Sequence, residues 1–174
     1  MKKQKGFSLI ELLIVVAIIL IIAAIAIPNL LRSKIAANES SAVGSVRTIG
    51  TAQVTYSSSW GQGYANTLLQ LGGPAPCTTA SAASACLIDA LLSTGGNIKS
   101  GYQFAMAGQK ADANGAFQGF EINADPTNVQ TTGVRHFCDD QTGVLKFSMA
   151  AIGTGNDACT AVPIVPGTSG PVGN

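Results

Sequence analysis

An apolar run near the start of this chain constrains its fold more than any other feature. Residues 7–27 read FSLIELLIVVAIILIIAAIAI and carry one charge, on Glu11. A helix over these residues would be roughly 30 Å long, which is the thickness of the hydrocarbon core of a bilayer. Three of the ten basic residues lie within the first five positions, and basic residues on one flank hold that flank in the cytoplasm. The run therefore predicts a membrane-spanning helix, with the rest of the chain exported.

Two ordinary kinds of segment fit this description. A secretory signal peptide has a basic start, an apolar core and a small-residue cleavage site, which Ala24-Ile25-Ala26 would supply. A permanent anchor needs only the length and the hydropathy of the run. In either case the exported part would be a secreted or membrane-anchored binding domain, or an enzyme with an unfamiliar fold.

A more specific pattern overlaps the start of the run. Residues 5–13 read KGFSLIELL, and the apolar run that follows ends at Pro28. This pattern resembles the class III signal of type IV pilins, which the pseudopilins of type II secretion share. The resemblance implies that residues 1–6 are a leader, which a membrane-embedded prepilin peptidase removes between Gly6 and Phe7. It also implies that the same enzyme methylates the new N-terminal amine of Phe7.

Glu11 and Pro28 are the candidate assembly residues of this segment. An acidic side chain at the centre of a spanning helix costs about 3 kcal/mol, so Glu11 is a functional candidate. The resemblance implies that Glu11 pairs with the amine of Phe7 in a neighbouring subunit and sets the axial register of a filament. Pro28 removes one helical hydrogen bond and kinks or loosens the helix. The resemblance implies that the helix can melt around this proline during assembly.

Beyond Pro28 the pattern stays helical and becomes amphipathic, so we expect one helix over residues 7–58. Apolar residues recur at helical spacing on one face: Ile35, Ala42, Val46, Ile49 and Tyr56. Charged and polar residues are expected off that face: Arg32, Lys34, Asn38, Glu39 and Arg47. Gly44 and Gly50 each weaken the helix by about 1 kcal/mol relative to alanine. Close packing of the helix on an exported head is the favoured explanation for both glycines.

Residues 59–174 form the expected head. Short helical or irregular stretches are expected at residues 64–71 and 87–92. Apolar residues then alternate with polar ones in four candidate strands, which predicts an antiparallel sheet over about residues 102–149. These strands are residues 102–107, 120–124, 134–138 and 144–149, with a turn at 139–143. The predicted fold is therefore α+β and pilin-like, with the amphipathic half of the long helix packed on a small sheet.

Two parts of the head carry more specific expectations. In strand 120–124, Glu121 and Asn123 alternate with the apolar positions and are expected on the face away from the core. Residues 163–174 form a C-terminal tail rich in proline and glycine, which is expected to be mobile surface.

The four cysteines, Cys77, Cys86, Cys138 and Cys159, all lie in the exported part. No C-x-x-C spacing occurs, which argues against structural zinc. An even count outside the cytoplasm favours two disulfides, and three pairings are open. We favour Cys77 with Cys86, which would close a loop rich in serine and alanine, and Cys138 with Cys159, which would tie the C-terminal loop to the sheet.

Few residues suggest catalysis, a metal or a cofactor. The chain has one histidine, His136, and it lies in a predicted strand, where a structural role is favoured. Asp139, Asp140 and Gly143 do not match an EF-hand loop, so a tight turn is favoured over a calcium site. The net charge is +1, without a basic block beyond the first five residues, which argues against nucleic acid as a partner. We therefore expect no enzyme, no metal and no cofactor.

Together with the resemblance, these observations lead us to expect a structural subunit of a type IV pilus. Its precursor would cross the inner membrane once through residues 7–27. An ATP-driven assembly machine would then polymerise it with its own copies into a helical filament at the cell surface, for adhesion, motility or surface attachment. A pseudopilin of a type II secretion system and a minor pilin are the alternatives that share the same segment.

Overall fold

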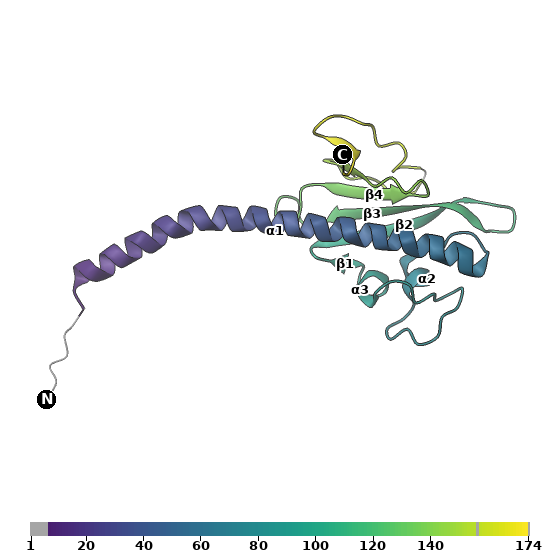
Figure 1. Ribbon diagram of the computed structural model, residues 1–174, viewed down its shortest axis with the longest axis horizontal. Helices are drawn as coiled ribbons and strands as arrows, with labels where there is room; N and C mark the ends of the chain where they lie inside the picture. The colour runs from purple at the N-terminus through teal and green to yellow at the C-terminus, as the bar shows by residue number, and fades with distance from the viewer. Residues whose placement is uncertain (1–6, 156, 174) are drawn as a thin grey trace. The chain divides into compact units, whose positions relative to one another are not determined.

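The computed structural model describes residues 7–155 and 157–173 and combines one long helix with a six-stranded sheet (Figure 1). The helices are α1 (Leu9–Trp60), α2 (Leu68–Gly72) and α3 (Ala90–Ser93). The strands are β1 (Ile98–Lys99), β2 (Tyr102–Ala111), β3 (Phe117–Pro126), β4 (His136–Asp140), β5 (Lys146–Ser148) and β6 (Ser169–Pro171). The predicted α+β fold is confirmed.

The chain separates into two compact units, and the division falls inside α1. The first unit ends at Lys34 and the second begins at Ile35. The helix was expected to end at residue 58, and it ends at Trp60. The compact head, however, begins at Ile35, well before the end of the helix. The head includes the second half of α1 because that half supplies one side of the core.

The first unit consists of the apolar part of α1. The helix continues through Pro28 without interruption. Its large apolar side chains are exposed, from Phe7 at 81% to Leu31 at 51%. Within the part of the chain that the structure describes, α1 is the one helix long and apolar enough to cross a membrane.

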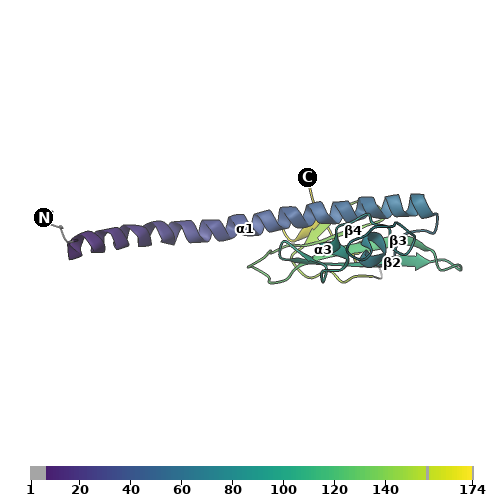
Figure 2. The same ribbon diagram turned by 90° about the horizontal axis from the view of Figure 1, so that it is seen from below.

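The second unit is built on an antiparallel meander. The strands lie in the order β1-β2-β3-β4-β5-β6, and each pairs with its neighbour in sequence. Within this unit α1 runs along one face of the sheet, as both views show (Figures 1 and 2). The long pair β2–β3 forms the centre of the sheet, with Phe104 opposite Ala124.

The core fills the space between α1 and the sheet. From α1 it contains Ala42, Val46, Ile49, Ala52 and Tyr56, as the apolar face predicts. From the sheet it contains Tyr102, Phe104, Phe120, Ile122, Ala124 and Phe137. Leu68, Leu71 and Leu92 of the two short helices close one side of it. The apolar face of α1 and the apolar face of the strands thus pack together in one hydrophobic layer.

The helix differs from expectation at two positions. Glu39, expected off the apolar face, is buried with 6% of its surface exposed. Gly44 is exposed, and a Cβ atom built on it would meet nothing within 4 Å, so close packing does not explain this glycine. At Gly50 the expectation holds, since a Cβ atom there would lie 3.0 Å from Oδ2 of Asp139.

The sheet also differs from expectation at its edges and its outer face. Strands β1 and β6 were not predicted, and β6 lies within the tail expected to be mobile. Asp139 and Asp140 end β4 instead of lying in the turn. Glu121 and Asn123 do point away from α1, but they are buried at 1% and 0% exposure. The connection between β5 and β6, called the C-terminal loop below, covers them.

Candidate functional site

The candidate processing and assembly residues lie around the start of α1. Gly6 lies outside the described residues, whereas Phe7 is described and exposed. The backbone N–H of Ser8 donates to Oε2 of Glu11 over 2.9 Å. This contact is half of a capping box, in which an acid three residues into the helix satisfies a free backbone donor. The S-x-x-E spacing of Ser8 and Glu11 is the sequence signal for it.

The cap gives Glu11 a local partner at the N-terminus of its own helix. Negative charge is favourable there because the first N–H groups of a helix carry partial positive charge. Among the residues that the structure describes, no cation pairs with Glu11. The carboxylate of Glu11 binds the N–H of Ser8, which directly follows Phe7 in sequence. Cleavage before Phe7 would create a free amine on that neighbouring residue.

The helix beyond this cap is apolar all round. Every residue of α1 from Leu9 to Leu31 is exposed except Ala23, which is half-buried. A helix with apolar side chains on every face needs a lipid environment or other apolar helices around it. This segment is therefore the main interaction surface that the described chain offers.

A cluster of hydrogen bonds fastens α1 to the head just after the unit boundary. Oε1 of Glu39 accepts the backbone N–H of Val134 at 2.9 Å and that of Arg135 at 3.1 Å. Oε2 of Glu39 binds the guanidinium of Arg135, with Nε at 2.8 Å and a terminal nitrogen at 2.7 Å. Burial raises the pKa of Glu39, but these hydrogen bonds outweigh it and hold the pKa below its usual value. Asn38 adds a hydrogen bond from its side chain to the carbonyl of Thr132, at 2.8 Å.

Farther along α1, buried polar side chains hold the short segments of the head. Gln53 is fully buried and makes two hydrogen bonds with the backbone of Ala65, at 2.8 and 2.9 Å. The hydroxyl of Tyr56 donates to the carbonyl of Ala82 at 2.6 Å. Ala82 lies inside the loop that Cys77 and Cys86 close, so Tyr56 docks this loop on the helix.

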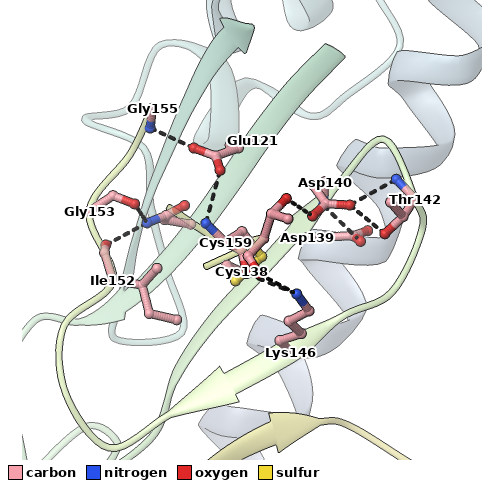
Figure 3. Close-up of a disulfide and its surroundings, with 12 residues drawn as sticks. Glu121, Cys138, Asp139, Asp140, Thr142, Lys146, Ile152, Gly153, Gly155 and Cys159 are labelled. Carbon is pink, nitrogen blue, oxygen red and sulfur yellow. Dashed lines mark hydrogen bonds between the residues drawn. A yellow bond between two sulfur atoms is a disulfide. The ribbon is translucent and has the colours of Figure 1, made fainter. Parts of the chain in front are cut away.

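Two disulfides join the cysteines in the sequential pairing that the sequence favours. Cys77 is bonded to Cys86, and Cys138 is bonded to Cys159. The second bridge links β4 to the C-terminal loop, as Figure 3 shows. Its two cysteines have a sequence separation of 21. The loop is thereby held over the outer face of the sheet.

Two side chains of β3 form hydrogen bonds with the backbone of the same loop (Figure 3). Glu121 accepts the backbone N–H groups of Gly155 and Cys159, at 2.7 and 2.9 Å. Asn123 donates from its amide nitrogen to the carbonyls of Ile152 and Gly153. These contacts hold the loop against the outer face of the sheet, and they explain why two polar residues are buried there.

The remaining polar candidates have structural partners. Asp140 accepts hydrogen bonds from the backbone and hydroxyl of Thr142 and, at 2.9 Å, from the hydroxyl of Thr160. The Nδ1 atom of His136 lies 2.6 Å from a carboxylate oxygen of Asp125. Among the described residues, no group of three or more histidine, cysteine or acidic side chains could hold a metal ion.

Comparison with known proteins assigns the N-terminal segment. Residues 1–27 match the family model of the prokaryotic N-terminal methylation motif. Over 39 residues the chain is 62% identical to the type IV wide pilus major component PilA4 of Thermus thermophilus, covering 22% of this chain and 30% of that protein. Over 54 residues it is 46% identical to the type IV major pilin protein PilA of Myxococcus xanthus, covering 31% of this chain and 24% of that protein.

The chain thus spans less than a third of the length of either curated relative. No solved structure matches it. The methylation motif, the similarity to two pilins and the long apolar helix followed by an antiparallel sheet are together the features of the type IV pilin family that this chain shares.

Proposed function

We propose that this chain is the structural subunit of a type IV pilus. Its precursor is held in the inner membrane by residues 7–27, with the head exported. Members of the pilin family are structural proteins, and the partner of such a subunit is its own copy. On assembly, residues 7–27 leave the lipid and pack against the apolar helices of other subunits.

One observation carries this proposal. Apart from Glu11 and Asn29, the side chains of α1 from Leu9 to Leu31 are apolar, and almost all are exposed, while the core of the protein lies wholly in the second unit. An unpaired apolar helix of this size is stable in a bilayer or in a bundle of like helices. Because the head has its own core, it does not need this part of the helix for folding. The helix can therefore lie first in the bilayer and later in a bundle of like helices.

Processing would occur at the start of this helix. We propose that prepilin peptidase cuts between Gly6 and Phe7 and that the amine of Phe7 is then methylated. Glu11 would exchange its hydrogen bond with Ser8 for the amine of Phe7 in a neighbouring subunit. Such a pair attracts by roughly 4 kcal/mol at about 4 Å before desolvation, which offsets much of it. The pair would therefore set register more than it adds stability.

Mass spectrometry of the mature N-terminus tests the processing step. We expect a chain that starts at methylated Phe7. A chain that starts at Ile27 would indicate an ordinary signal peptide, and a retained N-terminal methionine would indicate a fixed anchor. Either result would contradict the proposal.

Electron microscopy of sheared surface fibres tests the filament. We expect long fibres in which this protein is the main component, and their loss when its gene is deleted. Extraction from the bilayer requires an assembly ATPase, so inactivating that ATPase should leave the processed subunit in the membrane. Short periplasmic assemblies instead of surface fibres would favour a pseudopilin, and trace amounts in fibres made of another subunit would favour a minor pilin.

A further inference from the structure

Asp139 is a buried carboxylate that the contacts described so far do not explain. It lies on β4 opposite Ile122 of β3, so its side chain shares the face of the sheet that packs on α1. Only 5% of its surface is exposed. Figure 3 shows it beside Asp140, whose side chain is held by threonine hydroxyls.

One oxygen of Asp139 lacks a hydrogen-bond donor. Oδ1 accepts the backbone N–H of Asp140 at 3.0 Å, whereas Oδ2 has no hydrogen bond to any residue that the structure describes. Oδ2 lies against α1 where Gly50 leaves room for it. The backbone of α1 offers no donor there, because N–H groups inside a helix already bind the carbonyls four residues earlier. Burial, together with the neighbouring charge of Asp140, raises the pKa of Asp139 to about 6.

Two cavities open beside this carboxylate. One has a volume of about 380 Å³ and lies between Arg47, Gly50 and Thr51 of α1 and the end of β4. The other, of about 450 Å³, continues toward β6 and shares Arg47, Asp139 and Gly143 with the first. Each has ample volume for one long side chain, so Asp139 is accessible to a group that enters from outside the head.

The nearby cations of the same chain do not pair with Asp139. The charge of Arg47 lowers the pKa of Asp139, but Arg47 is exposed and forms no ion pair within 4 Å. Lys146 instead donates to the carbonyls of Cys159 and Thr160. The described part of the head thus leaves the carboxylate without a close cation.

Besides Arg47, two further cations of the described chain form neither an ion pair nor a side-chain hydrogen bond, and both lie at the end of its apolar segment. Arg32 and Lys34 are exposed and form no ion pair or hydrogen bond with any described residue. By contrast, Lys99, Lys110 and Arg135 each pair with a carboxylate of the head. An unpaired buried acid and unpaired exposed bases on one chain are complementary when copies of that chain associate.

We propose that the cavity beside Asp139 receives the side chain of Arg32 or Lys34 from a second copy of this chain. The proposal rests on the proposed filament, in which copies lie side by side. The entering cation donates a hydrogen bond to Oδ2, and the contact fixes how far neighbouring subunits are offset.

Zero-length crosslinking of sheared filaments tests the contact directly. A carbodiimide joins a carboxylate to an amine only where the two touch, so we expect a dimer on a denaturing gel. Mass spectrometry of that dimer should join the peptide containing Asp139 to the peptide containing Lys34. The Arg32→Lys variant extends the test to position 32. Filaments that crosslink at other sites, but at neither of these, would overturn the proposal.

Removal of the charge tests its role in assembly. Asp139→Asn keeps the shape of the side chain, and we expect it to lower the yield of filaments per membrane subunit by about tenfold. Asp157→Asn is the matched control, because Asp157 is an exposed acid paired with Lys110 outside the cavity. A lower amount of subunit in the membrane would indicate a folding defect, so both amounts are measured.

A double-mutant comparison separates this contact from unrelated effects. Arg32→Gln with Lys34→Gln should lower the yield about as much as Asp139→Asn, and all three changes together should lower it no further. Multiplying losses would overturn the proposed contact. Normal filaments from Asp139→Asn would do the same and leave the pilin proposal intact, whereas the absence of filaments from the unmutated chain would contradict the pilin proposal itself.

Discussion

Glu39 and Asp139 are both carboxylates buried beside α1, yet their pKa values move in opposite directions. Burial alone raises the pKa of each. Glu39 accepts two backbone N–H groups and the guanidinium of Arg135, and these outweigh burial. Asp139 accepts a single backbone N–H, so burial prevails, and the charge of Asp140 raises the pKa of Asp139 further. The number of donors therefore decides which of the two acids stabilises the head.

Asp139 should make the folded protein less stable as the pH rises. Its pKa is about 6 in the folded chain against an ordinary value of 3.8, so the folded state binds the extra proton between these values. Asp139→Asn should therefore raise the free energy of unfolding by about 1–2 kcal/mol near pH 7.5 and by much less near pH 4.5. Thermal unfolding of the full-length protein in detergent measures this. An equal gain at both pH values would contradict the assignment.

Glu39→Gln should have the opposite effect. The depressed pKa of Glu39 means that its contribution is present above its ordinary pKa of 4.5 and is lost as the pH falls through the folded value. Near neutral pH we expect a loss of about 2 kcal/mol, because Arg135 is left without its partner. Asp157→Asn, at an exposed ion pair, should change stability by less than about 0.5 kcal/mol. Chemical denaturation of the three proteins compares them.

At the scale of elements, periodicity predicts what one face of a helix or strand buries. The apolar face of α1 and the central strands β2, β3 and β4 were predictable because each element buries one side against the same core. The burial of Glu121 and Asn123 was not, because it depends on the C-terminal loop that crosses the sheet. The edge strands β1 and β6 are too short for their own pattern to identify them.

The two helix glycines give a matched test of packing. Gly44→Ala should stabilise the protein by up to about 1 kcal/mol, because alanine favours the helix and the space around Gly44 is open. Gly50→Ala should destabilise it, because the added Cβ atom would lie 3.0 Å from the carboxylate of Asp139. Melting temperatures of the two variants show the sign. Stabilisation by both substitutions would mean that Asp139 moves aside without cost.

Removal of the Cys138–Cys159 bridge should loosen one loop more than the whole head. Replacing both cysteines with serine should cost about 3 kcal/mol in the entropic model for a loop of this length. Hydrogen exchange should show faster exchange at the N–H groups of Gly155 and Cys159, which Glu121 holds. Core amides of β2 should keep their protection relative to these. Uniform loss across the sheet would indicate that the bridge supports the core itself.

At the scale of the molecule, the apolar segment and the hydrophobic core belong to different units. The core cluster draws on α1 only from Ala42 onward. Sequence alone identified the segment and its candidate residues, since a charged, capped apolar helix has a local signature. The cavity beside Asp139 had no such signature, because it joins α1 to the end of β4 across nearly ninety residues of sequence.

A chain that begins at Ile35 should therefore fold without the segment. We expect a soluble monomer with both disulfides and with the near-ultraviolet circular dichroism of the full-length protein, because every residue of the main core cluster is retained. Light scattering checks the monomer, whereas the full-length chain should need detergent. Aggregation of the truncated chain would mean that the first unit contributes to the stability of the head.

The fastening of α1 at Asn38 and Glu39 has a mechanical consequence. The turns between Pro28 and these residues carry one backbone hydrogen bond fewer and have no side-chain anchor to the described sheet. Under tension these turns would unfold first, while the head kept its core and its two disulfides. A fibre built from such subunits would lengthen under load as these turns unfold, and it would shorten when the load was removed and the turns refolded.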